Sequence, residues 1–237
     1  MKFNFIMPII YNKDFNQQIK NALNCTYYSV MQSANFVDYN IDVNFIVVGT
    51  DEKLISQDNI FYINANSNIE KPVLDRENKR LIGLKYVLKN NHNSWNMYLE
   101  AGDLISENFF ILICEYIKNN INSKAFIFKS GYIKTEQEVL FVKGNNKKFY
   151  KNFQSSIIFH VNSLDTIFYQ LNSLIKSVEF LVNNNINFIF IDEPIVCSLI
   201  DSKVSYNYFF YNETTINNIT KVFQTKESIK SNFRLYF

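Results

Sequence analysis

Residues 80–103, RLIGLKYVLKNNHNSWNMYLEAGD, contain the pattern from which the rest of the chain can be interpreted. Leucines at helical spacing predict a helix in its first half, and the polar run after them predicts a turn. The apolar run Trp95–Leu99 predicts a short buried strand. This strand leads into the acidic turn Glu100-Ala101-Gly102-Asp103. Carboxylates at a strand end predict a metal or phosphate site, because their oxygens bind hard divalent cations.

Short apolar runs alternate with helical patterns along most of the chain. Runs rich in Ile, Val and Phe are typical of strands that are covered on both faces. The runs predicted as strands are Phe3–Ile9, Val43–Val48, Ile60–Ile63, Trp95–Leu99, Ala125–Phe128, Ser156–Phe159 and Phe188–Ile191. Because strands and helices alternate in the first half, we predict an α/β fold with a mostly parallel sheet flanked by helices.

Helical patterns lie between these runs. The first helix is predicted after Asp14, with Gln17 completing a capping-box-like pair. The helix predicted after Ser106 is apolar almost all round, which predicts deep burial. Residues 131–153 break the pattern and predict a hairpin or a loop. Two further helices are predicted at about 76–89 and 164–185.

The composition limits the classes of protein that the chain can belong to. With 237 residues, of which 47% are hydrophobic, the chain can bury the core of one domain. A net charge of +2 gives no electrostatic case for nucleic acid. Cys25, Cys114 and Cys197 are too scattered for a disulfide framework or a zinc site, which predicts a reducing compartment. The apolar amino-terminal segment is too short for a signal peptide or a membrane span, so we predict a cytoplasmic protein.

Motifs at strand ends and in one helix follow a fixed order in the first half of the chain. The order is Pro8 with Tyr11-Asn12 after the first strand, Gly49-Thr50-Asp51 after the second, Arg80-x-x-Gly83 in a helix, and Glu100 to Asp103 after the next strand. Over about residues 3–112 this order resembles the family 2 glycosyltransferases of the GT-A fold. In that family the motifs are P-x-Y-N, an acidic turn, R-N-x-G and a turn of the DxD type. The run FIFIDEPIV is similar to a later strand of the family that ends in E-P-L.

The resemblance implies a nucleotide-sugar site along the carboxyl edge of the sheet, where ligands of open α/β sheets bind. It implies a UDP- or GDP-sugar donor and a divalent cation, Mn or Mg, that stabilises the diphosphate leaving group. The implied metal ligands are Asp103, which matches the final Asp of the family turn, and Glu100, which replaces its first Asp. The implied donor-binding residues are Pro8, Tyr11, Asn12, Asp51, Arg80, Gly83, Glu100 and Gly102.

The same residues also have purely structural interpretations. An acid that precedes a helix interacts favourably with the helix dipole, and turn residues need no ligand to explain them. The structural alternatives are a helix-dipole acid for Asp103, a strand-end surface residue for Glu100, an exposed helix charge for Arg80, a close-packing position for Gly83, and ordinary turns for Asp51 and for Tyr11-Asn12.

The catalytic base lies outside these motifs. Inverting members of the family take the acceptor proton with a carboxylate from a later helix, commonly in an E-D pair. No such pair occurs between residues 155 and 190, where the candidates are Glu179 and, less favoured, Asp165. The absence of an E-D pair leaves open a different base or an inactive protein.

The resemblance implies metal-assisted, inverting transfer of a sugar to a hydroxyl of a glycan or lipid-linked acceptor, in surface polysaccharide, lipopolysaccharide or glycan biosynthesis. It divides one GT-A-like domain (1–237) into a nucleotide-sugar half (1–112), an acceptor-side half (113–213) and a helical tail (214–237). The tail interleaves basic and aromatic residues, and it either packs on the domain or contacts the inner face of a membrane. The alternative is a catalytically degenerate GT-A-like domain that binds a glycan or a protein.

Overall fold

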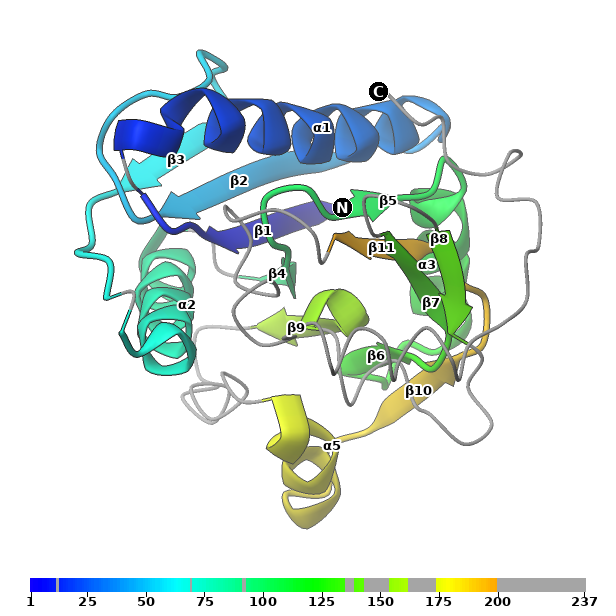
Figure 1. Ribbon diagram of the computed structural model, residues 1–237. Helices are drawn as coiled ribbons and strands as arrows, with labels where there is room; N and C mark the ends of the chain where they lie inside the picture. Colours follow the sequence, from blue (N-terminus) through cyan, green and yellow to red (C-terminus); the bar gives the residue numbers. More distant parts are fainter. Residues whose placement is uncertain are drawn as a thin grey trace.

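The computed structural model describes residues 1–11, 13–68, 70–90, 93–134, 139–142, 154–161 and 174–199. Its central sheet has seven strands in the order β10-β6-β9-β4-β1-β2-β3 (Figure 1). All seven predicted strands are present in this sheet, with small shifts in their bounds. The bounds are Lys2–Pro8 (β1), Asp42–Val48 (β2), Ile60–Ile63 (β3), Ser94–Tyr98 (β4), Ala125–Phe128 (β6), Ile157–Val161 (β9) and Phe188–Ile191 (β10).

The sheet is mostly parallel, as predicted. Strand β1 pairs in parallel with β2 and β4, so that Phe5 lies opposite Phe45 on one side and Met97 on the other. Strands β2 and β3 are parallel, as are β6 and β10. Only β9 runs against its neighbours, β4 and β6, among the described strands of this sheet. The ends of β1, β2, β3 and β4 therefore lie on one edge.

Helices cover both faces of the sheet (Figure 1). Phe3, Phe5 and Met7 of β1 pack in one core cluster with side chains of α1 and α3. Ile6, which points to the opposite face because side chains alternate along a strand, packs in a second cluster with α2 and α5. The helices are Asn16–Asn35 (α1), Pro72–Asn90 (α2), Phe109–Asn119 (α3) and Leu174–Asn183 (α5).

A second sheet lies beside the carboxyl end of β4. It has four strands in the order β5-β11-β7-β8, namely Leu104–Ile105 (β5), Val196–Leu199 (β11), Gly131–Lys134 (β7) and Val139–Val142 (β8). Strands β7 and β8 pair antiparallel, so a hairpin, one of the two alternatives predicted for residues 131–153, is present in the described part of that range. The sequence pattern did not predict β5 and β11, because β5 is too short for a pattern and β11 begins at Val196, shortly after the predicted strand that ends at Ile191.

Three predictions about the helices are wrong in detail. Helix α1 begins after a 3-10 turn, Lys13–Phe15 (η1), and its N-cap is Phe15, without a side-chain capping bond. The Asp14–Gln17 capping pair therefore does not form. Helix α3 buries only Phe109, Phe110, Ile113 and Cys114, so it is a surface helix with one buried stripe. Helix α2 begins earlier than predicted, at Pro72, a residue suited to the first position of a helix.

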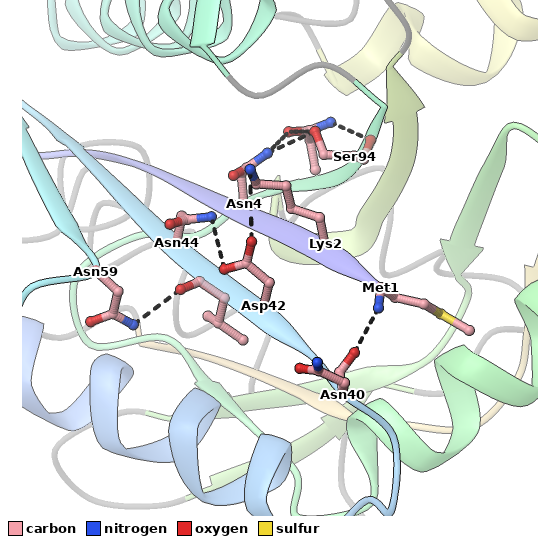
Figure 2. A network of polar contacts seen from close by, with 10 residues as sticks. Met1, Lys2, Asn4, Asn40, Asp42, Asn44, Asn59 and Ser94 are labelled. Carbon is pink, nitrogen blue, oxygen red and sulfur yellow. Dashed lines mark hydrogen bonds and ion pairs between the residues drawn. The ribbon is translucent and has the colours of Figure 1, made fainter.

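Buried amides link β1 and β4 near their amino ends (Figure 2). The Asn4 side-chain amide donates to Ser94 Oγ at 2.8 Å and to Asn96 Oδ1 at 2.9 Å. All three side chains are buried, and these hydrogen bonds offset part of the cost of burying polar groups. Nearby, the terminal amine of Met1 donates to the Asn40 carbonyl at 2.7 Å. These contacts fix the sheet at the edge opposite to the predicted site.

None of the helices in the described ranges combines the length and the hydropathy that a membrane span needs.

Candidate functional site

The segments after β1, β2, β3 and β4 meet at the carboxyl edge of the sheet. The Ile9 amide donates to the Val48 carbonyl at 2.9 Å, and the Gly49 amide donates to the Ile63 carbonyl at 2.9 Å. The Leu99 amide donates to the Ile6 carbonyl at 3.1 Å. Backbone pairing therefore continues to the ends of these strands and brings together residues that are far apart in the sequence.

The acidic turn after β4 is closed by its own residues. The Asp103 amide donates to the Glu100 carbonyl at 3.0 Å, and the Glu100 amide donates to Asp103 Oδ2 at 3.0 Å. Gly102 has a φ of 98°, a conformation that costs glycine little and other residues more. Asp103 is only 1% exposed. One oxygen of Asp103 thus holds the turn itself.

A polar stripe on α1 holds the segment that follows this turn. The Gly102 amide donates to Thr26 Oγ1 at 2.9 Å, and the Ile105 amide donates to Ser29 Oγ at 3.3 Å. One turn further along α1, Ser33 Oγ accepts from the amide of Phe110 at 3.2 Å. The sequence contains a signal for this stripe, since these hydroxyls recur at helical spacing within an otherwise apolar face.

Glu100 is the centre of a buried ion-pair cluster. Its Oε1 lies 3.3 Å from Arg76 Nη1 and 3.8 Å from Arg80 Nη2, and both arginines belong to α2. Glu100 and Arg80 are each 1% exposed, and Arg76 is 5% exposed. The interpretations of Glu100 as a surface residue and of Arg80 as an exposed helix charge are therefore wrong. Glu100 serves at least as the buried counter-ion of two guanidinium groups.

Arg80 also contacts the ring of Tyr98. Its guanidinium carbon lies 5.0 Å from the ring centroid, within the range of a cation–π contact. Burial, helped by the nearby charge of Arg76 and opposed by Glu100, lowers the pKa of Arg80 to about 9. Arg80 thus remains a cation at neutral pH. It pairs with an acid, which is one of the structural roles open to a buried guanidinium.

The donor set predicted for a divalent cation fits this geometry only in part. Glu100 faces two positive guanidinium groups, which disfavour a cation at the same oxygen. Asp103 remains suitable, since Mg²⁺ is commonly held by one or two carboxylates together with substrate phosphates. Among the residues that the structure describes, no three His, Cys, Asp or Glu side chains come together as a metal site.

Tyr11 connects the ends of β1 and β2. Its phenol donates to Glu52, which also accepts from Asn16 Nδ2 at 3.1 Å. The hydrogen bond from Tyr11 is the main cause that lowers the pKa of Glu52, and it raises the pKa of Tyr11. Asp51, the predicted residue, is exposed, so its neighbour Glu52 is the acid that the structure ties to this edge. Adjacent acids in a turn cannot be told apart from sequence alone.

Gly83 of α2 lies where the helix crosses β1 and β2. A Cβ atom at this position would overlap Cγ2 of Ile6 and lie 3.2 Å from Cγ2 of Val48. Gly83 is therefore a close-packing position, which was its structural interpretation. Pro8 is the buried last residue of β1.

Lys79 of α2 is only 1% exposed. Its Nζ donates to the Ile9 carbonyl at 2.8 Å, directly after β1. The sequence carries no signal for this contact, because a lysine on a helix is usually solvated. It is the main residue at this edge that sequence reasoning missed.

Of the two predicted catalytic bases, only Glu179 lies among the described residues, and no contact described there joins it to this cluster. Glu179 is exposed on α5, whose Phe180 and Leu181 pack into the core on the same face as α2. Asp165, like the donor-binding candidate Asn12 and the tail 214–237, lies outside the described residues. Their predicted roles therefore stay predictions.

Two hollows adjoin the strand-end residues. One, of about 390 Å³, is lined by residues that include Lys13, Asn16 and Glu52. The other, of about 310 Å³, lies between α2 and the segment after β3, and its lining includes Asn66 and Lys79. Both are near the lower end of the size range of small-molecule sites.

Comparison with known proteins shows the fold. No protein-family model and no curated protein matches the chain in sequence. The structure is similar to TarS 1–349 of S. aureus in complex with UDP, with a TM-score of 0.53, 13% identity and coverage of 84% of this chain and 61% of that one. It is also similar to TarS 1–349 in complex with UDP-GlcNAc, with a TM-score of 0.52, 11% identity and coverage of 87% and 60%. The chain thus spans less than two thirds of those structures, and at this identity the likeness is one of fold. The chain has a GT-A type α/β fold, with a mostly parallel sheet flanked by helices.

Proposed function

We propose that this protein is a glycosyltransferase that moves a sugar from a nucleoside diphosphate donor to a hydroxyl group. The observation that carries the proposal is the likeness of fold to TarS 1–349, which was solved with UDP and with UDP-GlcNAc, over more than four fifths of this chain. The residues at the carboxyl edge support it, because ligands of open α/β sheets bind beyond the ends of parallel strands.

Different parts of the edge would serve different parts of the donor. The nucleoside would lie against the segments after β1 and β2, where Tyr11 and Glu52 form a polar pair. The diphosphate would lie at the acidic turn, where Gly102 lets the backbone approach closely. Glu100, with Arg76 and Arg80, would hold the amino-terminal turns of α2 beside that turn.

Metal assistance is a separate part of the proposal and rests on Asp103. A bound Mn²⁺ or Mg²⁺ supplies positive charge that stabilises the departing diphosphate. We assign Glu100 to the arginines instead, since its Oε1 lies within 3.3 Å of one guanidinium and 3.8 Å of another. Removal of metal with EDTA then lowers turnover, and Asp103→Asn lowers it in the metal-loaded enzyme.

The acceptor side rests on the resemblance alone. We propose a glycan or lipid-linked hydroxyl as acceptor, in surface polysaccharide or lipopolysaccharide synthesis at the cytoplasmic side of a membrane, with inversion at the sugar carbon. Glu179 is the candidate base, and Glu179→Gln should slow transfer by about 100-fold or more while donor binding is kept. Unchanged turnover in this variant would remove Glu179 from the mechanism.

A panel of nucleotide sugars tests the function directly. The full chain is incubated with UDP- and GDP-sugars, with and without MnCl₂, and release of free nucleotide is measured. We expect release from at least one donor, because enzymes that transfer sugars also transfer them slowly to water. Binding of a nucleotide without release from any donor would favour the degenerate binding module. If the protein neither binds a nucleotide nor releases one from any donor, the proposal is overturned.

A further inference from the structure

Lys79 is the centre of a buried polar network at the carboxyl edge. Its Nζ donates to the Ile9 carbonyl at 2.8 Å, to Ser67 Oγ at 2.6 Å and to Asp75 Oδ2 at 2.9 Å. The side chain of Lys79 is 1% exposed, and that of Asp75 is 5% exposed. The ammonium group is therefore almost completely enclosed by protein atoms and bound by protein oxygens.

The network joins segments that belong to different strands. Ile9 follows β1, Ser67 lies in the segment after β3, and Asp75 lies in the first turn of α2. Ser67 Oγ also accepts from the backbone amide of Tyr11 at 3.2 Å. The Tyr11 phenol donates in turn to Glu52, after β2. Lys79 and Ser67 thus connect α2 with the ends of β1 and β3, and the Tyr11–Glu52 pair extends the network to the end of β2.

Burial of Lys79 is unfavourable in itself. Burial lowers the pKa of Lys79, and the hydrogen bond and charge of Asp75 oppose this shift. Apolar residues of similar volume often replace a buried ion pair without loss of stability, so packing alone does not explain a lysine here. What the ammonium provides and an apolar side chain cannot is a fixed geometry for Ile9 and Ser67.

We propose that Lys79 is a positioning residue for the donor nucleotide. It holds residues 9–11 and the segment at Ser67 in the arrangement that receives the nucleoside, and it acts through them rather than by contact with the ligand. Preorganised segments bind more tightly because less ordering is needed when the ligand arrives. Lys79 and Asp75 also line the 310 Å³ hollow beside α2, so the same network sets one of its walls. This inference rests on the proposed function and adds a residue to its site.

Three variants and a control test the role. The double variant Asp75→Asn with Lys79→Met removes both charges together, which avoids leaving one buried charge unpaired. Ser67→Ala removes the link to Tyr11 but keeps the Lys79–Asp75 pair. Lys79→Arg keeps the positive charge but replaces the compact ammonium group with a planar guanidinium group. The control is Lys85→Met, since Lys85 is exposed on the same helix.

The readouts are the dissociation constant of UDP, by calorimetry, and the KM and kcat for the donor found in the nucleotide-sugar panel. We expect the double variant to raise the UDP dissociation constant and the donor KM by about tenfold, while kcat at saturating donor changes by less than about threefold. Ser67→Ala should raise the donor KM by a smaller factor. Lys79→Arg should keep only part of the wild-type affinity for UDP. Lys85→Met should match the wild type.

The outcomes separate this inference from the proposed function. If wild-type protein binds UDP and the folded double variant binds it equally well, Lys79 has no positioning role, and the proposed function stands. If kcat falls together with the melting temperature while KM is unchanged, the network is structural only, and the inference is overturned. If wild-type protein binds neither UDP nor GDP, the proposed function fails, and the inference fails with it.

Discussion

Glu100 shows how burial decides what a charged residue does. In the sequence it is an acid in a turn and a candidate metal ligand. In the structure it is 1% exposed and faces Arg76 and Arg80. Ion pairs taken out of water are sensitive to the loss of one partner, because the remaining charge stays buried and uncompensated. Asp51 is also an acid, but it lies in an exposed turn and has no such constraint.

This difference predicts the effect of neutralising Glu100. Glu100→Gln leaves two buried guanidinium groups without their shared carboxylate, and we expect a loss of about 3–5 kcal/mol in the free energy of unfolding. Urea denaturation measures it. Asp51→Asn, the exposed control, should change stability by less than about 0.5 kcal/mol. Equal stabilities of the two variants would show that the cluster does not stabilise the fold.

The cysteines provide a second test at this scale. Burial raises the pKa of Cys197 to about 12, helped by the nearby charge of Asp103. Cys114 is fully buried, whereas Cys25 is partly exposed on α1. Because the thiolate is the reacting form, native protein at pH 8 should react with iodoacetamide at Cys25 first. Peptide mass spectrometry gives the order, with urea-unfolded protein as the control. Early labelling of Cys197 would contradict its burial in β11.

Helix α2 is the element on which the edge depends. It lies across β1 and β2 at Gly83, and its first turns carry Arg76, Lys79 and Arg80 toward the strand ends. The hydrophobic pattern predicted this helix correctly, because leucine spacing reports which face is buried. It could not show that basic side chains of the same helix are buried as well, since that depends on partners in distant segments.

The close contact at Gly83 gives a prediction for the element. In Gly83→Ala the new methyl group overlaps Ile6, so packing strain opposes the usual gain of helix propensity. We expect a net loss of about 1–2 kcal/mol, because overpacking costs more than glycine does in a helix. Thermal unfolding measures it, and Lys85→Ala on the exposed face is the control. A more stable variant would mean that α2 is free to move away from the sheet.

Prediction failed where a signal was short or not hydrophobic. Strand β5 has two residues and carries no periodicity of its own. The start of α1 was misplaced because Asp14 and Gln17 fit a capping motif, whereas the helix begins without a side-chain cap. The stripe of Thr26, Ser29 and Ser33 was visible as polar residues on a buried face, but its partners lie more than 70 residues away.

At the scale of the molecule, the order of strand-end motifs predicted the fold class correctly. Parallel strands bring residues 8–11, 49–52 and 100–103 to one edge, as the resemblance required. The metal site and the catalytic base were harder to predict from the sequence than the fold. A metal site depends on which carboxylate oxygens stay uncommitted, and the base depends on residues after the regular first half. The division into donor and acceptor halves stays a prediction.

The central claim is that the carboxyl edge of β1 and β2 binds the nucleoside of a nucleotide sugar. Photo-crosslinking of the full chain with 5-azido-UDP, followed by peptide mapping, tests it most directly. We predict labelling in peptides that contain residues 9–11 or 49–52, and loss of that labelling when unmodified UDP is added. Labelling confined to other segments, such as the opposite edge around Asn40, or labelling that UDP does not compete away, would contradict the claim.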